Sequence, residues 1–329
     1  MDEPKISVVM PVRNAEQYIE QALKGLENLH FDSWELLIVD DGSTDGTALA
    51  LNRWLQVTPV DSTLISHETS RGVAAARNAA VDQAKGQFIW FVDGDDSWAA
   101  DILRHLWSGV SDGTVDIVAC DAERVVAKTG HVSAIQDAPH EEIIGGFEAL
   151  QRILSGEIQG HLWNKIIRTR LLQRHPFPEM RSHSDLAGLI RLTAESRQVA
   201  MIPGAKYYYN VHEGSILQSS DYKWETLIAC SEIAEATLAH KKWKGRLQRD
   251  LALFKASHVM VPAANSISLN KSWEPDKIPY RDCMTLSLLF SSLTRGQGLL
   301  AAKSLAIRHA PRMYAAIYRR HHVKKWGSE

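Results

Sequence analysis

Short apolar runs alternate with segments of helical periodicity along the first hundred residues. The apolar runs predict buried strands at residues 6–12, 34–39, 62–66 and 88–92. Apolar residues spaced three and four apart predict helices at 15–26 and 73–84, and the polar loop after the second strand leads into a further helix. Such alternation predicts an α/β fold whose mostly parallel sheet carries helices on both faces.

An acidic segment, Asp93-Gly94-Asp95-Asp96, directly follows the fourth predicted strand. Three carboxylates at the end of a buried strand repel one another unless a cation holds them, and hard oxygen ligands suit Mg²⁺ or Mn²⁺. The carboxyl ends of strands are also where open α/β sheets bind ligands. The alternative interpretation is an acidic turn that caps the next helix, with Asp96 or Ser97 as the N-cap.

A second acidic loop follows the strand at 34–39 and begins Asp40-Asp41-Gly42-Ser43. The carboxyl ends of parallel strands meet at one edge of a sheet. We therefore expect the loops at 40–41 and 93–96 to lie at the same edge, where they would form one crevice.

Composition agrees with this fold but does not decide its function. The 329 residues allow one large domain with an appendage or two domains, and an apolar content of 45% is ample for a core. Cys120, Cys230 and Cys283 are far apart and show no disulfide or metal spacing, which favours a reducing cytoplasm. The acidic N-terminus does not resemble a signal peptide, and no apolar run approaches the ~20 residues that span a bilayer.

The segment from Cys283 to Ser328 contains no Asp or Glu, although it carries eight Lys or Arg residues with apolar residues between them. We interpret it as a basic amphipathic helix pair, broken at Pro311 and suited to an anionic membrane surface. A solvated helical hairpin packed on the catalytic domain is the alternative. Nucleic acid is not an expected partner, because no nucleic-acid-binding motif accompanies the charge.

Four ordered segments resemble the signatures of family 2 glycosyltransferases with the GT-A fold. They read ISVVMPVRNAEQYI, LLIVDDGSTDGT, RGVAAARNAAVDQAKGQFIWFVDGDDSW and LWNKIIRTRLL. The resemblance implies a Rossmann-like GT-A catalytic domain at 1–215 and a helical C-terminal region at 216–329. It also implies a nucleotide-sugar donor, a divalent Mn²⁺ or Mg²⁺ ion and inversion at the anomeric carbon.

The resemblance assigns the donor side of the site to residues at the strand ends. Asp95 would be the direct metal ligand, and Asp93 would contact the ribose or a metal-bound water, with Asp96 as a less defined third member. Asp41 matches the carboxylate that accepts a hydrogen bond from N3–H of uracil, while Asp40 has an equal claim to ordering the loop. The other expected donor-side residues are Pro11 and Arg13 in the nucleotide pocket, Arg77 beside the nucleotide, and His212 at the metal or the diphosphate. An ordinary exposed helix charge is the alternative for Arg77.

On the acceptor side, the resemblance places the general base at Asp185, which would take the proton from the acceptor hydroxyl. Ser184 stands where family members usually carry Glu. The N-cap of a helix at 186–194 is the alternative role for Asp185. His183 would tune Asp185 or bind the acceptor.

The family's Trp-x-Lys segment is present as Trp163-Asn164-Lys165, and we expect it to contribute to the acceptor site. Trp98 and Trp163 are candidates for stacking on a sugar, because one end of each ring can stay wet. The tyrosines at 207–209 favour core packing instead.

These features predict an inverting glycosyltransferase that moves a hexosyl or hexuronosyl group from a UDP-sugar to a bacterial surface glycan, with lipopolysaccharide core preferred. The alternatives are a transferase for capsule, teichoic acid or another glycan, and an inactive nucleotide-sugar-binding protein. An unrelated dehydrogenase or nucleotidyltransferase is disfavoured, since no Gly-x-Gly-x-x-Gly or P-loop follows the first strand. We expect a cytoplasmic protein, peripheral on the inner face of the membrane, that meets a glycan or glycolipid acceptor.

Overall fold

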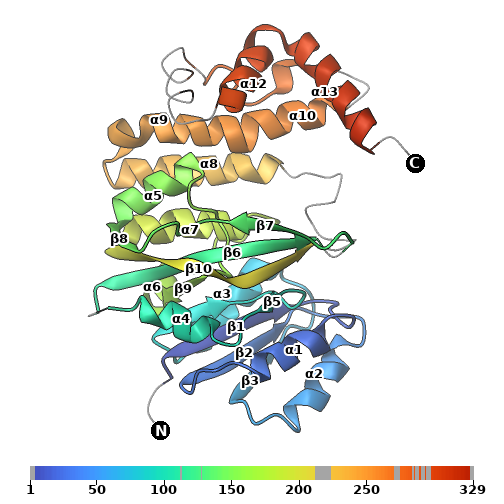
Figure 1. Cartoon of the computed structure of the whole chain (residues 1–329), viewed down its shortest axis with the longest axis vertical. Coiled ribbons are helices and arrows are strands. Elements are labelled where there is room, and N and C mark those ends of the chain that lie inside the picture. The colour runs from blue at the N-terminus through green and yellow to red at the C-terminus, as the bar shows by residue number, and fades with distance from the viewer. Residues whose placement is uncertain are drawn as a thin grey trace. The chain divides into compact units, whose positions relative to one another are not determined.

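The computed structural model describes residues 4–111, 113–126, 128–211, 224–269, 275–283, 285, 289, 293 and 298–326 (Figure 1). In the last helix, side chains are described as far as residue 321. The chain divides into two compact units, Met1–Ile153 with Glu157–Ser215 and Leu154–Gly156 with Ile216–Glu329. A functional domain boundary at residue 215 stays a prediction.

One mixed sheet runs through the first unit, with strand order β3-β2-β1-β4-β9-β6-β10-β5 and with β7 paired to β6 and β8 to β10. The strands are β1 (Ile6–Val12), β2 (Trp34–Asp40), β3 (Ser62–Ser66), β4 (Phe88–Phe91), β5 (Ser97–Trp98), β6 (Val115–Val126), β7 (His131–Ile135), β8 (Glu142–Gly145), β9 (Lys165–Arg168) and β10 (Gln198–Val211). The first four pair in parallel, whereas β9 lies antiparallel to both β4 and β6. The α/β prediction is confirmed, and the four predicted strands agree to within one residue at each end.

Helices pack on both faces of the sheet formed by β1 to β4 (Figure 1). The helices of the first unit are α1 (Ile19–Glu27), α2 (Thr47–Leu55), α3 (Val73–Gln83), α4 (Ile102–Ser108), α5 (Gly146–Ser155), α6 (Thr169–Arg174) and α7 (Ser184–Glu195), although the last two residues of α5 are assigned to the second unit. On one face, Val8 and Met10 pack with Leu23 of α1 in the main core. The intervening residues of β1 point to the other face, where α3 lies against β1 and β2 and buries the small side chains of Ala76 and Ala80.

Parallel pairing brings the two acidic loops to one edge of the sheet, as predicted. Val12 of β1 is opposite Asp40 of β2, and Val9 is opposite Phe91 at the end of β4. The backbone continues this alignment, because Asp41 N–H donates to the Val12 carbonyl at 2.9 Å and Val92 N–H donates to the Val9 carbonyl at 3.0 Å. The loops therefore leave neighbouring strands side by side.

Helices and the turns between them make up the described residues of the second unit from Trp224 onward. α8 (Trp224–His240) precedes α9 (Lys244–Phe254), which continues through the π-helical stretch Lys255–Met260 into α10 (Val261–Leu269). A 3₁₀ turn at Pro275–Lys277 is followed by α12 (Gly298–His309) and α13 (Pro311–Trp326). Pro311 is the first residue of α13, a position where its missing N–H leaves no helical bond unmade, so the predicted break is confirmed.

The apolar side chains of α12 and α13 divide between two faces, which differs from the single apolar face expected from the sequence. Ala301, Ile307 and Tyr314 are buried in the core of their own unit. Leu299 is 70% exposed and Ile317 is 60% exposed. The two helices thus pack through one face and present further apolar side chains on another. Within the described residues, no helix is both long enough and apolar enough to cross a membrane.

Candidate active site

β10 holds the acidic loop in place through Asp96, which is buried. The Tyr207 hydroxyl donates to Asp96 Oδ2 at 2.7 Å, and Asn210 N–H donates to Oδ1 at 2.8 Å. Asp93 N–H donates to the same hydroxyl at 3.3 Å, and the Asn210 side-chain amide donates to the Asp95 carbonyl at 3.2 Å. Burial, and then the charge of Asp93, raise the pKa of Asp96 to about 8 against the effect of these hydrogen bonds. Asp96 therefore anchors the loop.

These contacts overturn the interpretation of Asp96 or Ser97 as a helix N-cap. The next helix, α4, begins only at Ile102, and Asp101 occupies its N-cap position. Ser97 instead starts β5, where it pairs with Tyr208 of β10. The acidic turn is therefore tied to a distant strand and not to the helix that follows it.

Asp93 lies beside a buried arginine and close to two further carboxylates. Nη2 of Arg77 is 3.8 Å from Oδ1 of Asp93. Burial raises the pKa of Asp93 most, the charge of Arg77 lowers it, and the charges of Asp95 and Asp185 raise it, so that it reaches about 6. Three segments that the sequence singled out separately are thus close together, namely Arg77, the acidic loop and Asp185.

The guanidinium of Arg77 has unused hydrogen-bonding capacity. The residue is only 8% exposed, so the alternative of an ordinary exposed charge is wrong. Its guanidinium lies 6.0 Å from the ring of Phe91 and 5.9 Å from that of Phe177, and its Nε has no hydrogen-bond partner in the described residues. An unsatisfied buried N–H costs about 1–3 kcal/mol, which a phosphate oxygen would relieve.

Asp93 and Asp95 supply the hard oxygen donors that Mg²⁺ and Mn²⁺ prefer. In the part of the chain that the structure describes, no three His, Cys, Asp or Glu side chains are arranged to hold a metal by themselves. The donor set still fits such an ion, because Mg²⁺ is usually held by one or two carboxylates together with substrate phosphates. His212, the other predicted ligand, lies outside the described residues.

Asp41 is buried at the end of β2 and accepts four hydrogen bonds. His67 Nδ1 and Arg71 N–H donate to Oδ1 at 2.7 and 2.8 Å, while the Ser70 hydroxyl and Gly72 N–H donate to Oδ2 at 2.7 and 2.9 Å. Burial raises the pKa of Asp41, but these bonds outweigh it and lower the value to about 2. All four lone-pair sites are used, so a hydrogen bond from uracil would have to replace one of them. The uracil contact stays a prediction.

The remaining donor-side residues lie around the same loop. Pro11 pairs with Val39 of β2, but the pairing of β1 with β4 ends earlier, at Val9. Pro11 therefore has a neighbouring strand on one side only, a position at which a sheet tolerates proline. Arg13 is exposed just beyond the strand. Asp40 accepts a 3.0 Å hydrogen bond from Ser43 N–H, which agrees with a loop-ordering role.

Asp185 lies in the first turn of α7, where its charge suits the positive end of the helix dipole. It is not the N-cap, because α7 begins at Ser184 and His183 precedes it in a left-handed conformation, with φ of 61° and no side-chain cap. Oδ1 of Asp185 accepts from Leu186 N–H at 2.8 Å. His183 is half-buried, and its Nδ1 lies 3.2 Å from the Ser182 hydroxyl.

Trp163 is not placed to stack on a sugar, because only 6% of its surface is exposed. Its ring stacks on Tyr207 at 4.7 Å between centroids and on His161 at 4.6 Å. Its carbonyl accepts a 2.7 Å hydrogen bond from the indole N–H of Trp90. Trp98 is only partly exposed and stacks at 6.1 Å on Tyr207, so the aromatic side chains mainly contact one another.

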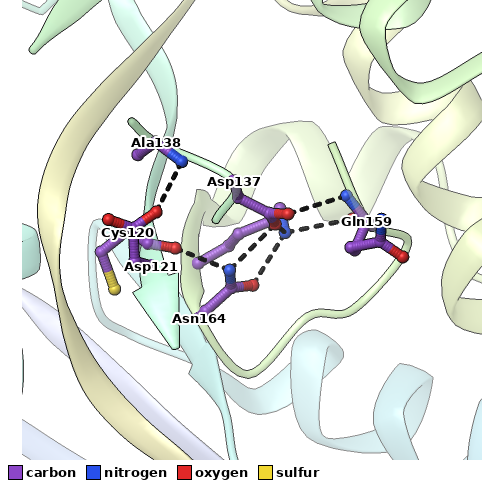
Figure 2. A network of polar contacts seen from close by, with 7 residues as sticks. Cys120, Asp121, Asp137, Ala138, Gln159 and Asn164 are labelled. Atoms are coloured by element: carbon purple, nitrogen blue, oxygen red, sulfur yellow. Dashed lines mark hydrogen bonds and ion pairs between the residues drawn. The ribbon is translucent and has the colours of Figure 1, made fainter. Parts of the chain in front are cut away.

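Lys165 lies in the protein interior instead of at an acceptor, with only 1% of its surface exposed. Its Nζ forms a 2.6 Å ion pair with Asp137 and donates to Oδ1 of Asn164 at 2.7 Å and to the Gln159 carbonyl at 3.2 Å. Figure 2 shows the surrounding network, in which Asn164 also donates to Asp137 and to the Cys120 carbonyl. All three N–H groups of the ammonium are used, which leaves Lys165 a supporting role.

The sequence alone did not single out His161, which the structure places near the predicted base. It lies between Gln159 and Trp163 and is half-buried. Burial lowers its pKa most, while the charge of Asp185 raises it, so the imidazole is near the predicted base. Its position two residues before Trp163 was the only local signal, and that signal does not distinguish it from other loop histidines.

A family model described as glycosyl transferase family 2 matches residues 7–175, just over half of the chain. The chain belongs to this family. EpsH of Bacillus subtilis strain 168, named as a glycosyltransferase, is 27% identical over 83% of this chain and 79% of EpsH. TarS of Staphylococcus aureus strain Mu50, named as a poly(ribitol-phosphate) beta-N-acetylglucosaminyltransferase, is 25% identical over 82% of this chain and 47% of TarS. WfgD of Escherichia coli, named as a UDP-Glc:alpha-D-GlcNAc-diphosphoundecaprenol beta-1,3-glucosyltransferase, is 37% identical over 32% of this chain and 40% of WfgD.

Solved structures share the fold of this glycosyltransferase. S. aureus TarS 1–349 in complex with UDP has a TM-score of 0.69 at 23% identity, over 96% of this chain and 92% of that chain. Its complex with UDP-GlcNAc has a TM-score of 0.70 at 22% identity, over the same shares. The mannosyltransferase PcManGT from Pyrobaculum calidifontis, in complex with GDP-Man and Mn²⁺, has a TM-score of 0.55 at 18% identity, over 99% and 88%. These similarities support the GT-A fold.

The buried ion pair generates a stability prediction. Lys165→Met should lower the free energy of unfolding by about 3–5 kcal/mol, because Asp137 is left as a buried charge without its counter-ion. Urea denaturation followed by circular dichroism measures this loss. The matched control is Lys85→Met, an exposed lysine in the same unit, for which we expect a change within about 0.5 kcal/mol. Equal midpoints for the two variants would contradict the prediction.

Proposed function

We propose that this family 2 glycosyltransferase moves a sugar from a UDP-sugar to a hydroxyl of a bacterial surface glycan, with inversion at the anomeric carbon. The observation that carries the proposal is the meeting of Asp93, Asp95 and Asp185 beside Arg77. The charges of Asp93 and Asp95 suit a cation, that of Asp185 suits the acceptor proton, and that of Arg77 suits a diphosphate. The complexes of TarS with UDP and with UDP-GlcNAc support a uridine diphosphate donor.

The acceptor that we propose is a cell-surface glycan. Lipopolysaccharide core is the candidate preferred from the sequence. The name of TarS points to poly(ribitol-phosphate), and that of WfgD to a sugar linked to diphosphoundecaprenol. Capsule, teichoic acid and lipid-linked oligosaccharides are therefore candidates of the same class, and all of them present hydroxyl groups to the site.

The transfer that we propose is a single displacement. Asp185 takes the proton from the acceptor hydroxyl while the acceptor oxygen forms a bond to the anomeric carbon. The bond between that carbon and the diphosphate oxygen breaks on the opposite face, and UDP leaves with the electron pair. Arg77 holds the diphosphate through its buried guanidinium, and Asp96 with Tyr207 keeps the acidic loop in position.

Asp95 would hold Mn²⁺ or Mg²⁺ directly, with Asp93 at the ribose or a metal-bound water and His212 as a further expected ligand. When bound, the ion supplies Lewis-acid stabilisation of the negative charge that develops on the departing diphosphate. The mannosyltransferase solved with GDP-Man and Mn²⁺ supports such an ion in this fold.

Asp95→Asn should lower metal-supported release of UDP by about 10²–10³-fold, because the amide keeps the shape of the side chain but loses the charge that attracts the cation. The measurement is a coupled assay for UDP over a panel of UDP-sugars, with Mn²⁺, Mg²⁺ or EDTA. Asp82→Asn, at an exposed position on α3, is the matched control and should retain full activity. Full turnover in EDTA or in Asp95→Asn would overturn the metal assignment.

Asp185→Asn should lower the rate of transfer by roughly 10²–10⁴-fold while UDP affinity is retained, if Asp185 is the general base. Its contribution to α7 through the helix dipole is small, about 0.3–1 kcal/mol, so the melting temperature should change little. Transfer rate, calorimetric UDP affinity and melting temperature are measured together, with the exposed Glu179→Gln as the control. Near-normal transfer by the stable variant would assign the base elsewhere, with His183 tested next.

An inactive nucleotide-sugar-binding protein is the second candidate, and the replacement of Glu by Ser184 beside the proposed base favours it. The same UDP assay separates the two candidates. Metal-dependent UDP release that falls in Asp185→Asn supports the enzyme. Tight UDP binding with no release from any UDP-sugar supports the binding protein.

We also propose that α12 and α13 dock on an anionic membrane surface, where a glycolipid acceptor would be met. Arg312, Arg319 and Arg320 are exposed on α13 together with Met313 and Ile317, and no acidic residue lies in either helix. Basic and apolar side chains on one exposed surface are typical of peripheral membrane binding.

Reversing Arg312, Arg319 and Arg320 to Glu should abolish cosedimentation with phosphatidylglycerol vesicles, and wild-type binding should weaken as salt is raised. The control reverses Lys242, Arg246 and Arg249 at the α8–α9 end of the same unit, which changes net charge equally. Equal losses in both variants would indicate a net-charge effect. No binding of the wild type at low salt would overturn the membrane proposal.

A further inference from the structure

Five aromatic side chains of the first unit form a stack beside the candidate active site. The buried rings of Trp163 and Tyr207 lie parallel within 9°, and His161 stacks on Trp163 within 15°. Tyr209 lies 5.9 Å from Trp163 within 10°, and 6.4 Å from His161 within 25°. Trp98 continues the stack on Tyr207. His161 and Tyr209 are near-parallel neighbours that both keep part of their surface exposed, whereas the rings of Trp163 and Tyr207 are buried.

The two partly exposed rings lie next to different members of the catalytic group. Tyr209 is close to the acidic loop, because the next residue, Asn210, donates hydrogen bonds to Asp96 Oδ1 at 2.8 Å and to the Asp95 carbonyl at 3.2 Å. Burial most, and then the charges of Asp96 and Asp95, raise the pKa of Tyr209 to about 12. The charge of Asp185 raises the pKa of His161 against the effect of burial, as described above. The ring pair is therefore near both the acidic loop proposed for the metal and the proposed base.

The loop that carries His161 is fixed at both ends by the buried network of Figure 2. Asp137 accepts from Gln159 N–H at 2.9 Å, and Lys165 donates to the Gln159 carbonyl, so the backbone before His161 is held. Asn164 and Lys165 hold the chain after it through the same Asp137 carboxylate. Such a loop positions a ring without help from a ligand, which is what a preorganised binding surface requires.

These positions fit the chemistry of a cyclic sugar. A pyranose has one face of C–H groups, which is attracted to the negative face of an aromatic ring, and hydroxyls around its rim. A neutral imidazole can both donate and accept a hydrogen bond, and a phenol can do the same. A linear polyol phosphate offers no such flat apolar face, so the ring pair suits a cyclic acceptor better than a polyol chain.

We propose that His161 and Tyr209 form the platform on which a pyranose ring of the acceptor lies, with one of its hydroxyls directed to Asp185. This inference rests on the proposed glycosyl transfer and specifies its acceptor. It replaces the role expected of Trp163, which instead supports the platform from beneath.

The test compares acceptor use with donor use in single variants. His161→Ala and Tyr209→Ala should each raise the half-saturating concentration of an acceptor glycoside by roughly 3- to 10-fold, as expected for the loss of one aromatic contact. The KM for the UDP-sugar and the slow acceptor-free release of UDP should stay within about twofold. His161→Phe and Tyr209→Phe keep a ring at each position and should restore acceptor use in part.

The probes are methyl glucoside, galactoside, mannoside and N-acetylglucosaminide, compared with a ribitol-phosphate oligomer, each added to the enzyme with Mn²⁺ and the UDP-sugar that it hydrolyses. Tyr208→Ala is the matched control, because Tyr208 points to the opposite side of β10 and should not affect acceptor use. UDP release that is stimulated by a methyl glycoside and weakened in the Ala variants supports the platform.

The platform would be overturned by stimulation by ribitol phosphate alone, by stimulation by no glycoside, or by equal acceptor use in wild type and both Ala variants. These outcomes differ from failure of the proposed function itself, in which no UDP-sugar is hydrolysed in the presence of a metal ion. A loss of UDP affinity in His161→Ala or Tyr209→Ala would assign the rings to the donor side and would equally overturn the inference.

Discussion

The fold places carboxylates at the ends of buried strands, and the cost of burying their charges must be offset by neighbouring groups. Burying a charge is costly unless hydrogen bonds or a counter-ion meet it. Asp41 accepts four hydrogen bonds, and Asp96 accepts one from a tyrosine hydroxyl and one from a backbone N–H. Asp137 forms an ion pair with Lys165. Asp93 differs, because Arg77 lies 3.8 Å away while other carboxylates stand nearby. The surroundings of Asp93 thus combine one cationic side chain with several like charges, whereas Asp41 and Asp137 are fully hydrogen-bonded and Asp96 is hydrogen-bonded but keeps a raised pKa.

The sequence predicted the N-terminal part of the sheet well because its strands are continuous apolar runs. The run at 88–92 could only be a short buried element, and the acids behind it had to lie at its exposed end. β9 escaped prediction for the opposite reason. It has four residues, begins with a lysine and lies between β4 and β6 antiparallel to both, and no local pattern encodes that pairing.

The site could be predicted as far as local signals and the family resemblance reach. The sequence predicted roles for the strand-end acids, Arg77 and Asp185 in this way. The structure brings these residues close together, and their roles stay predictions. The roles given to Asp96, Trp163 and Lys165 were wrong or incomplete because their partners are distant in sequence. Tyr207 lies 111 residues from Asp96, and Asp137 lies 28 residues before Lys165. A lysine or an acid is expected at the surface by default, and only the fold shows which ones are paired inside.

The buried network around Lys165 is better understood as a positioning device than as a source of stability. A well-packed apolar cluster of the same volume is often as stable as a buried ion pair, or more so. An apolar cluster, however, could not bind the backbone of Gln159 on both its N–H and its carbonyl, as Asp137 and Lys165 do. That directional hold fixes the loop from 159 to 165, and with it the ring of His161 against Trp163. The polar interior and the aromatic surface are thus parts of one arrangement, in which directional bonds in the interior set the position of rings that stay partly accessible.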